Sequence, residues 1–394
     1  MTAVPRADRH YGPVPPWRDV RVLRIGAQVA VVLVVALLVA TLAANLTSTM
    51  SERGLSFGFG FLTRRAGFEI GESPVPYSPN ATYRQAFIVG LLNTLFVGVL
   101  GIVLATVLGV VVGVARLSTN WLVNRVALGY VELMRNTPLL VQLFFIYFAV
   151  FLQLPPVRES VALPGAIFLN QRGLVVPGPQ PSPGFGAWLA LVAIGFGLGV
   201  AAWRIGARRR AAGLEGPPFG RLGLLAFIGL AVVGWVALAP LTFDIPVQGR
   251  FNFSGGLALS TSFTALLIGL VIYTAAFIAE VVRGGIQAVR RGQVEAARAL
   301  GLSEGDILRL VIFPQALRII VPPLTSQYLN LVKNSSLAIA VGYPDLFKVG
   351  VTMSNQTGQP IPVIVLIMGT YLALSLTTSL LMNFYNRRVQ VQER

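Results

Sequence analysis

The sequence predicts an all-α, polytopic membrane protein with about eight transmembrane helices. Of its 394 residues, 55% are hydrophobic and only 12% are charged, whereas a soluble domain usually carries about 25% charged residues. Several charge-free runs reach the roughly 20 residues that a helix needs to cross the hydrocarbon core. Most Arg and Lys residues lie in every second loop between these apolar runs, on one side of the expected membrane. Much of the surface therefore faces lipid.

Seven segments have the length and composition of ordinary spans. The eighth, 317–341, is apolar but interrupted by Pro322, Pro323 and Lys333, so its helix is the least regular. The eight expected spans are 25–46, 86–115, 138–154, 184–203, 222–243, 257–279, 317–341 and 361–382.

The distribution of Arg and Lys gives an independent test of these spans, because loops rich in these residues stay in the cytoplasm. With a cytoplasmic N-terminus and eight crossings, 22 of the 31 Lys and Arg residues fall inside, 8 fall outside and Lys333 lies within a span. We therefore expect both termini to be cytoplasmic. The net charge of +16 reflects membrane topology and does not indicate a nucleic-acid partner.

The first span allows two interpretations. A basic leader before an apolar run is typical of a cleaved signal peptide, and Ala40, Ala43 and Ala44 supply small residues. The run of 22 residues is longer than the 7–15 of a signal peptide, which favours a retained anchor helix. A polar loop follows at 47–85. The later stretch 154–183 is rich in Pro and Gly, which predicts turns and extended chain.

Catalytic and metal-binding chemistry has few candidates. The chain has no cysteine, and its single histidine, His10, lies in the polar N-terminal stretch. We expect no catalytic residues, no metal site and no cofactor. A phosphate-binding loop needs Gly-Lys-Ser/Thr, but the two lysines, Lys333 and Lys348, precede Asn334 and Val349. The chain therefore lacks an ATP-hydrolysing loop of that kind.

The segment 280–323 is too polar to be embedded and too regularly patterned for a passive loop. Residues 294–300 (VEAARAL) predict a helix, and Gly301 suits a left-handed C-terminal cap. Ser303 and Asp306 predict a capping box that opens a second helix, which Pro314 should interrupt. Three interpretations are open: an amphipathic connector, a DNA-binding helix-turn-helix, or a docking element for a cytoplasmic partner. The segment is tethered to a membrane span on each side, which argues against docking into a DNA groove.

This segment resembles the EAA loop of bacterial ABC importer permeases. Glu295, Ala296 and Ala297 are followed after three residues by Gly301, and after nine more by the run 311–314 (VIFP). The family pattern is E-A-A-x3-G-x9-I-x-L-P, so Val311 and Phe313 are mild departures. In that family the loop is a coupling helix that docks into the ATPase subunit.

Three further stretches are similar to the polar amino acid branch of that family, the histidine, glutamine and arginine type. They are EVVRGGIQAV before the EAA loop, YVELMRNTPLLVQLFFIYF from Tyr130, and LVKNSSLAIAVGYPDLF from Leu331. The extra N-terminal helix and the inserted helical hairpin resemble the larger permease subunits of general L-amino acid importers. The expected division is a cytoplasmic tail (1–24), an extra helix (25–46), a periplasmic loop (47–85), a first core part (86–153), an insertion with the hairpin (154–256), a second core part (257–386) with a coupling loop at 283–316, and a cytoplasmic tail (387–394).

The resemblance implies a type I ABC importer permease core in the bacterial inner membrane, working by alternating access. It implies four partners: a separate ATPase subunit, a sister permease, a periplasmic solute-binding protein and an amino acid substrate. The residues that match the coupling loop, and that we expect at the ATPase contact, are Glu295, Ala296, Ala297, Arg298, Gly301 and Pro314.

Lys333 is a charge within a span, which costs roughly 2.5–3.5 kcal/mol on insertion scales. One interpretation is structural: Lys333 pairs with Glu280 or Glu132, or reaches the interface. The other is a substrate pathway that Lys333 lines together with the following residues Asn334, Ser335 and Ser336.

Two other classes of protein remain to be weighed. A secondary transporter would show inverted repeats and intramembrane carboxylates, but the sequence has no such repeat and its acids cluster at span ends or in loops. A membrane enzyme would need catalytic residues at recognisable spacing, and none is present.

Overall fold

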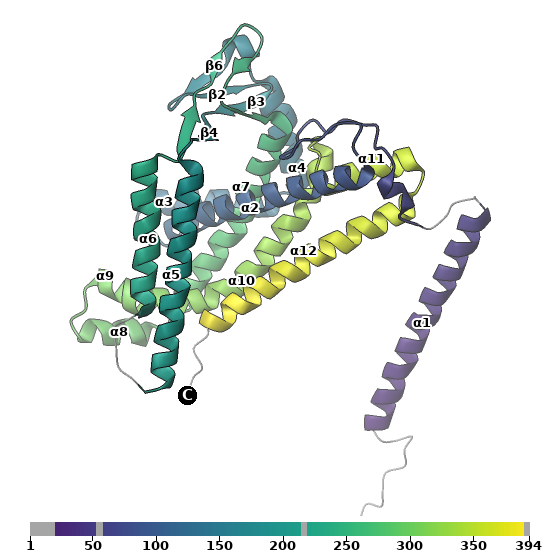
Figure 1. Ribbon diagram of the computed structural model, residues 1–394. Coiled ribbons are helices and arrows are strands. Elements are labelled where there is room, and N and C mark those ends of the chain that lie inside the picture. Colours follow the sequence, from purple (N-terminus) through teal and green to yellow (C-terminus); the bar gives the residue numbers. More distant parts are fainter. Residues whose placement is uncertain (1–19, 53–57, 214–218, 390–394) are drawn as a thin grey trace, which may run out of the picture.

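The computed structural model describes residues 20–52, 58–213 and 219–389 (Figure 1). His10 and most of the two expected terminal tails lie outside the described residues. The described chain is mostly helical, with small antiparallel sheets confined to residues 161–260.

Seven described helices are long and apolar enough to cross a membrane, and a bent pair of helices makes an eighth span if counted as one. This agrees with the expected count of about eight. The seven are Leu23–Asn45, Tyr83–Ala115, Phe185–Arg209, Phe219–Leu238, Thr261–Gln287, Glu304–Ala340 and Pro360–Phe384.

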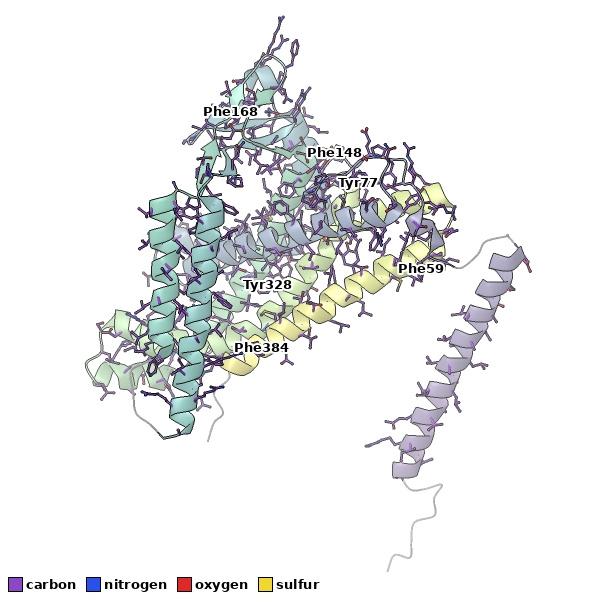
Figure 2. The ribbon with its side chains drawn as sticks, in the orientation of Figure 1. Phe59, Tyr77, Phe148, Phe168, Tyr328 and Phe384 are labelled. Carbon is purple, nitrogen blue, oxygen red and sulfur yellow. The ribbon has the colours of Figure 1, made fainter. Side chains whose placement is uncertain are left out.

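Helix α1 (Val20–Glu52) lies apart from the other helices. None of its described side chains is buried, and Figure 2 shows them pointing outward on every side. A helix that is apolar all round and unburied by protein is suited to lipid.

Helix α7 (Thr261–Gln287) is the centre of the fold, with 67% of its apolar window buried. Helix α2 (Tyr83–Ala115) packs against it at very close range. A Cβ placed on Gly109 would lie 2.6 Å from Cβ of Ile278, and one on Gly113 would lie 2.8 Å from the carbonyl oxygen of Ala279. Gly109 and Gly113 therefore lie on the line along which α2 and α7 pack.

The expected span 138–154 is present as a continuous helical run from Leu139 to Gln153, and a sharp bend precedes it. Helix α3 (Trp121–Asn136) and the run from α4 (Leu139–Phe144) to Gln153 bend by 106° at a break of two residues. Pro138 supplies no N–H and disfavours helical geometry at Thr137. Gln142 stabilises the break, because its Nε2 donates to the carbonyl oxygens of Met134 (2.9 Å) and Thr137 (3.1 Å).

The expected interruption of the second helix at Pro314 is wrong. The helical run continues from α9 (Glu304–Asp306) through a π-helical segment, Ile307–Ile312, into α10 (Phe313–Asn334). The wider π turn shifts the hydrogen-bond register just before the proline. Pro322 and Pro323 also lie inside α10, which ends in a 3-10 turn, Ser335–Ala340. Helix α11 (Leu346–Thr357) and helix α12 (Pro360–Val389) complete the chain.

The expected hairpin is present as α5 (Phe185–Ala211) and α6 (Phe219–Leu238). Glycines let the two backbones approach: a Cβ on Gly223 would lie 2.9 Å from the carbonyl oxygen of Gly199. Little of either helix is buried, so most of their apolar surface is free to face lipid.

The insertion also contains strands, where the sequence indicated only turns and extended chain. One antiparallel sheet has the order β1-β2-β3-β8, and two-stranded ribbons pair β4 with β5 and β6 with β7. These sheets form a cap at the β8 end of α7 (Figure 1). The strands are β1 (Val161–Leu163), β2 (Ile167–Asn170), β3 (Gly173–Val176), β4 (Gly178–Pro181), β5 (Leu241–Asp244), β6 (Val247–Gln248), β7 (Phe253–Ser254) and β8 (Leu257–Ser260).

Candidate functional site: the segment after helix α7

The helix–glycine–helix segment expected from the sequence is present directly after α7. Helix α8 (Arg291–Ala299) ends at Gly301, whose φ of 78° is left-handed. The N–H of Gly301 donates to the carbonyl of Arg298 (2.9 Å), and that of Leu302 donates to the carbonyl of Ala297 (3.2 Å). These two bonds form a Schellman motif. Glycine is favoured here because a side chain strains the left-handed backbone.

The second helix opens at Ser303, as expected. Its Oγ accepts from the N–H of Asp306 (3.2 Å), and its hydroxyl donates to Oδ2 of Asp306 (2.7 Å). The reciprocal contact thus joins the two side chains and does not return to the backbone N–H of Ser303. The turn is further held by Arg298, whose Nε donates to Oε1 of Glu304 at 2.8 Å.

Burial separates the expected contact residues into two groups. Ala297 is the one buried residue of α8, and α8 packs against the π segment, where Ile307 is the one buried residue. The small side chain of Ala297 therefore serves packing within this chain. Glu295 and Ala296 are exposed and remain available to another protein.

Large apolar side chains also lie exposed on this segment. Leu300 is 81% exposed, and Pro314 lies next to the exposed Phe313. An amide contact from Nε2 of Gln315 to Oε1 of Gln293 (3.0 Å) joins the start of α8 to the start of α10. The segment is thus a fixed, partly apolar surface at the end of α7. Its large exposed apolar residues are Leu300, Leu308, Leu310 and Phe313.

An ion-pair cluster anchors the preceding turn of α7. Glu280 accepts from Arg116, the residue that caps α2, at 2.5 Å, and from Arg283 at 2.8 Å. The expected pairing of Lys333 with Glu280 is therefore wrong, because this carboxylate is occupied. Glu132, the other suggested partner, accepts from the amide of Asn136 at 3.0 Å.

The candidate pathway residues lie where α10 tightens into its 3-10 turn. Lys333 is exposed and forms no ion pair with any described residue. Ser335 is fully buried and donates to the carbonyl of Val332 (2.7 Å), while Ser336 donates to the carbonyl of Lys333 (2.8 Å). Asn334 is half-buried. Both hydroxyls satisfy helix carbonyls, so among the described residues Lys333 and Asn334 are the members of this set whose side chains have no hydrogen-bond or ion-pair partner.

A buried polar cluster at the opposite end of α7 was not anticipated. The amide of Asn93 donates to the carbonyl oxygens of Glu72 (2.9 Å) and Pro344 (2.8 Å). The carboxylate of Asp345 accepts from the N–H of Lys348 (2.9 Å) and the hydroxyl of Tyr371 (3.2 Å). In the sequence, the one indication of this cluster was the carboxylate of Asp345, which lies in the apolar stretch after Ser336.

Burial dominates the electrostatics of this cluster. It raises the pKa of the fully buried Asp345 carboxyl to about 6, although hydrogen bonds and the charge of Lys348 lower it. Burial likewise raises the pKa of the Glu72 carboxyl, against the hydrogen bond from Ser260 and the charge of Lys348. Both acids therefore retain protons more readily than exposed carboxyls.

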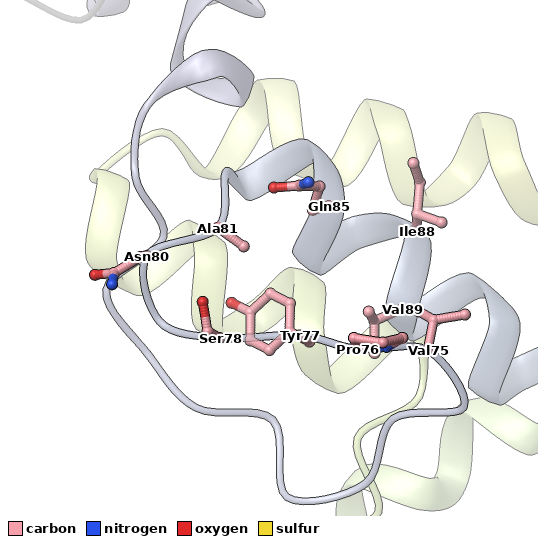
Figure 3. A pocket seen from close by; sticks show the side chains of 9 residues that line it. All are labelled: Val75, Pro76, Tyr77, Ser78, Asn80, Ala81, Gln85, Ile88 and Val89. Carbon is pink, nitrogen blue, oxygen red and sulfur yellow. The ribbon is translucent and has the colours of Figure 1, made fainter.

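A cavity of about 510 Å³ lies between the loop before α2 and the first turns of that helix. Figure 3 shows the lining residues Tyr77 and Ser78 on the loop and Gln85 and Ile88 on α2. None of the candidate pathway residues lines it. Among the residues that the structure describes, no group of three or more His, Cys, Asp or Glu side chains could hold a metal ion.

Residues 101–391 match the family described as binding-protein-dependent transport system inner membrane component. The general L-amino acid transport system permease protein AapQ of Rhizobium johnstonii is 46% identical over 381 residues, covering 95% of this chain and 94% of that protein. The putative amino-acid ABC transporter permease protein YhdX of Escherichia coli is 47% identical over 369 residues, covering 93% and 94%.

A solved structure described as an amino acid ABC transporter with histidines is 23% identical, with a TM-score of 0.47, and covers 78% of this chain and 95% of that chain. The family match spans well over half of the sequence, and the two relatives extend over nearly all of it. The chain therefore belongs to the family of inner membrane components of binding-protein-dependent transport systems.

Proposed function

We propose that this chain is the membrane-spanning permease of an ATP-driven importer for amino acids. Its two long relatives are named as amino acid permeases, which supports the substrate class. In this proposal both termini are cytoplasmic and the chain lies in the bacterial inner membrane. ATP hydrolysis takes place on a separate subunit, and a sister permease completes the translocation path.

The observation that carries the proposal is the segment from α8 to the π helix. It follows α7 after only three residues, so a displacement of α8 by a bound partner is transmitted directly to the central helix. The Schellman turn at Gly301 and the pair of Arg298 with Glu304 fix its shape. Glu295, Ala296 and Leu300 remain exposed. A rigid helix with a free face is suited to docking in a groove of the ATPase subunit.

Alternating access requires that the displacement of α8 change how the membrane-spanning helices pack. Helix α7 contacts α2, α3 and α10, so its movement displaces most of the bundle. Lys333, exposed and unpaired among the described residues, is available to the carboxylate of a passing amino acid.

Co-purification of the tagged chain from its native membrane tests the proposal. We expect recovery of an ATPase subunit and a second permease, and amino-acid-dependent ATP hydrolysis once the complex and a soluble solute-binding protein are reconstituted together. Recovery of the chain alone, with uptake driven by an ion gradient, would overturn the proposal in favour of a secondary transporter.

A further inference from the structure

The β cap lies on the opposite side of the membrane from the proposed coupling segment. Strand β8 leads directly into α7, whose 27 residues end just before α8. A helix of that length rises about 40 Å, enough to cross the bilayer. The cap and α8 are therefore separated by the membrane, and the tip of the β6–β7 ribbon lies at the far end of the cap (Figure 1).

Three arginines contact one exposed phenylalanine at this tip, two at its ring and one at its backbone. Phe251 is 68% exposed. The guanidinium carbons of Arg158 and Arg250 lie 5.0 Å and 5.4 Å from its ring centroid. Arg172 donates to the carbonyl oxygen of Phe251 at 3.3 Å. We call Arg158, Arg172, Arg250 and Phe251 the Arg–Phe cluster.

The cluster is held in place by the backbone. Nε of Arg158 donates to the carbonyl oxygen of Arg250 at 3.0 Å. Gln248 donates to the carbonyl oxygens of Val157 (2.7 Å) and Arg158 (3.0 Å). These bonds join the tip of the β6–β7 ribbon to the turn that begins the insertion. The guanidinium groups are therefore presented in a fixed arrangement, which lowers the entropy cost of binding.

No described acid forms an ion pair with these arginines, since the ion pairs of the described residues involve only Glu280 and Glu304. Glu159 is the neighbour of Arg158 in the chain and offsets part of the charge. Asp244 is engaged by the amide of Gln180 (3.0 Å) and the N–H of Gly256 (3.1 Å). The cluster thus keeps a net positive charge beside an exposed aromatic ring.

We propose that the Arg–Phe cluster docks an acidic surface of the solute-binding receptor. This inference rests on the proposed function and names the surface that the receptor uses. Arginine and aromatic residues are enriched at the centres of protein interfaces, and an uncompensated positive cluster selects a negative partner. The tip points away from the ends of α5 and α6 (Figure 1), which favours a soluble protein over lipid headgroups.

The cap also links this surface to the central helix. Strand β3 pairs with β8, and the hydroxyl of Thr261, the first residue of α7, donates to the carbonyl of Gln171 at 2.7 Å. Gln171 adjoins Arg172 of the cluster. A receptor held at the cluster therefore contacts a turn that is bonded directly to the start of α7, whose other end leads into α8.

The test uses the co-purified complex in nanodiscs, with the solute-binding protein that stimulates it and a mixture of L-amino acids. ATP hydrolysis is measured against receptor concentration for wild type, R158Q/R172Q/R250Q and F251A. We expect the receptor concentration for half-maximal stimulation to rise at least about tenfold in the triple variant. Basal hydrolysis should be unchanged, which also shows that the variant is folded. Added salt should weaken stimulation of wild type more than that of the triple variant.

R84Q is the matched control, because Arg84 is an exposed arginine in the first turn of α2, outside the cluster. Its half-maximal concentration should equal that of wild type. Equal receptor dependence in wild type and the triple variant would overturn the docking site. An effect that follows the phosphatidylglycerol content of the nanodisc, and not the receptor, would overturn it in favour of a lipid contact. Absence of receptor stimulation in the wild type would instead reject the proposed function.

Discussion

Glu280 of α7 joins the capping residue of α2, Arg116, to Arg283 one turn further along its own helix. The distance from Nη1 of Arg116 to Oε1 of Glu280 is 2.5 Å, and the two side chains are only 14% and 19% exposed. The pair joins α2 to α7, two closely packed helices, near the end of α7 that leads into the proposed coupling segment.

Glu280→Gln should loosen this junction. The substitution leaves two guanidinium groups near a neutral amide, and a partly buried charge without a partner is destabilising. We expect the free energy of unfolding to fall by about 1–3 kcal/mol, measured as a lower apparent melting temperature in nanodiscs. The control Glu132→Gln alters a carboxylate whose described hydrogen bond comes from a neutral amide and should have little effect. Equal losses in both variants would contradict a special role for the junction.

Gly109→Val should destabilise the packing of α2 on α7. A Cβ at this position would lie 2.6 Å from Cβ of Ile278, so the helices must separate or Ile278 must leave its rotamer. Overpacking of this kind costs about 1–3 kcal/mol, and a lower melting temperature would report it. Gly129→Ala is the control, because its Cβ would meet nothing within 4 Å and alanine favours helix. That variant should be at least as stable as wild type.

Glu295→Lys and Gly301→Trp should uncouple ATP hydrolysis from the receptor. Both residues are exposed, and at Gly301 a bulky residue combines steric exclusion of a partner with backbone strain. We expect stimulated hydrolysis in the reconstituted complex to fall at least about fivefold, the effect of roughly 1 kcal/mol at a contact.

Two further variants separate these causes at Gly301. Gly301→Asn tolerates the left-handed backbone and should retain most of the coupling, whereas Gly301→Ala adds strain without bulk. Normal coupling in both Glu295→Lys and Gly301→Trp would reject the docking assignment.

Lys333→Met should lower amino acid uptake without lowering stability. The ammonium group forms no ion pair with a described residue, so its removal leaves no carboxylate unpaired among them. A lost charged hydrogen bond to substrate would reduce transport by about tenfold or more, measured with radiolabelled amino acids in proteoliposomes. Lys333→Arg should retain part of the activity. Full uptake by the Met variant would show that Lys333 does not serve the pathway.

Asp345→Asn should flatten the dependence of stability on pH. Burial raises the pKa of Asp345 to about 6 in the folded protein, above the value of about 3.9 in an unfolded chain. The folded state therefore binds the proton more tightly, so this group favours folding at low pH and that benefit is lost as pH rises through about 6. Between pH 7 and pH 5, wild type should gain about 1 kcal/mol relative to D345N. Parallel melting profiles of the two proteins across this range would contradict the burial of a proton at this carboxyl.

The local features of the candidate site were predictable because each depends on near neighbours in the chain. Gly301 and Ser303 specify a turn and a helix start within a few residues, and both occur where expected. The start of a span at Pro138 was predictable, but the 106° bend before it was not, because Gln142 reaches back to α3 to stabilise that bend. Pro314 does not end the helix, because the π-helical segment before it shifts the hydrogen-bond register and so accommodates a residue that lacks a backbone N–H.

The sequence by itself determined that the chain spans a membrane, that it has about eight spans and which segment turns at Gly301. Span length and charge are additive properties of consecutive residues, so they need no knowledge of the fold. Only the tertiary structure decided that Glu280 binds Arg116 and not Lys333, that Ala297 faces its own chain, and that Asp345 is buried beside Tyr371. These outcomes depend on which helices pack together, and Arg116 and Glu280, for example, lie 164 residues apart in the chain.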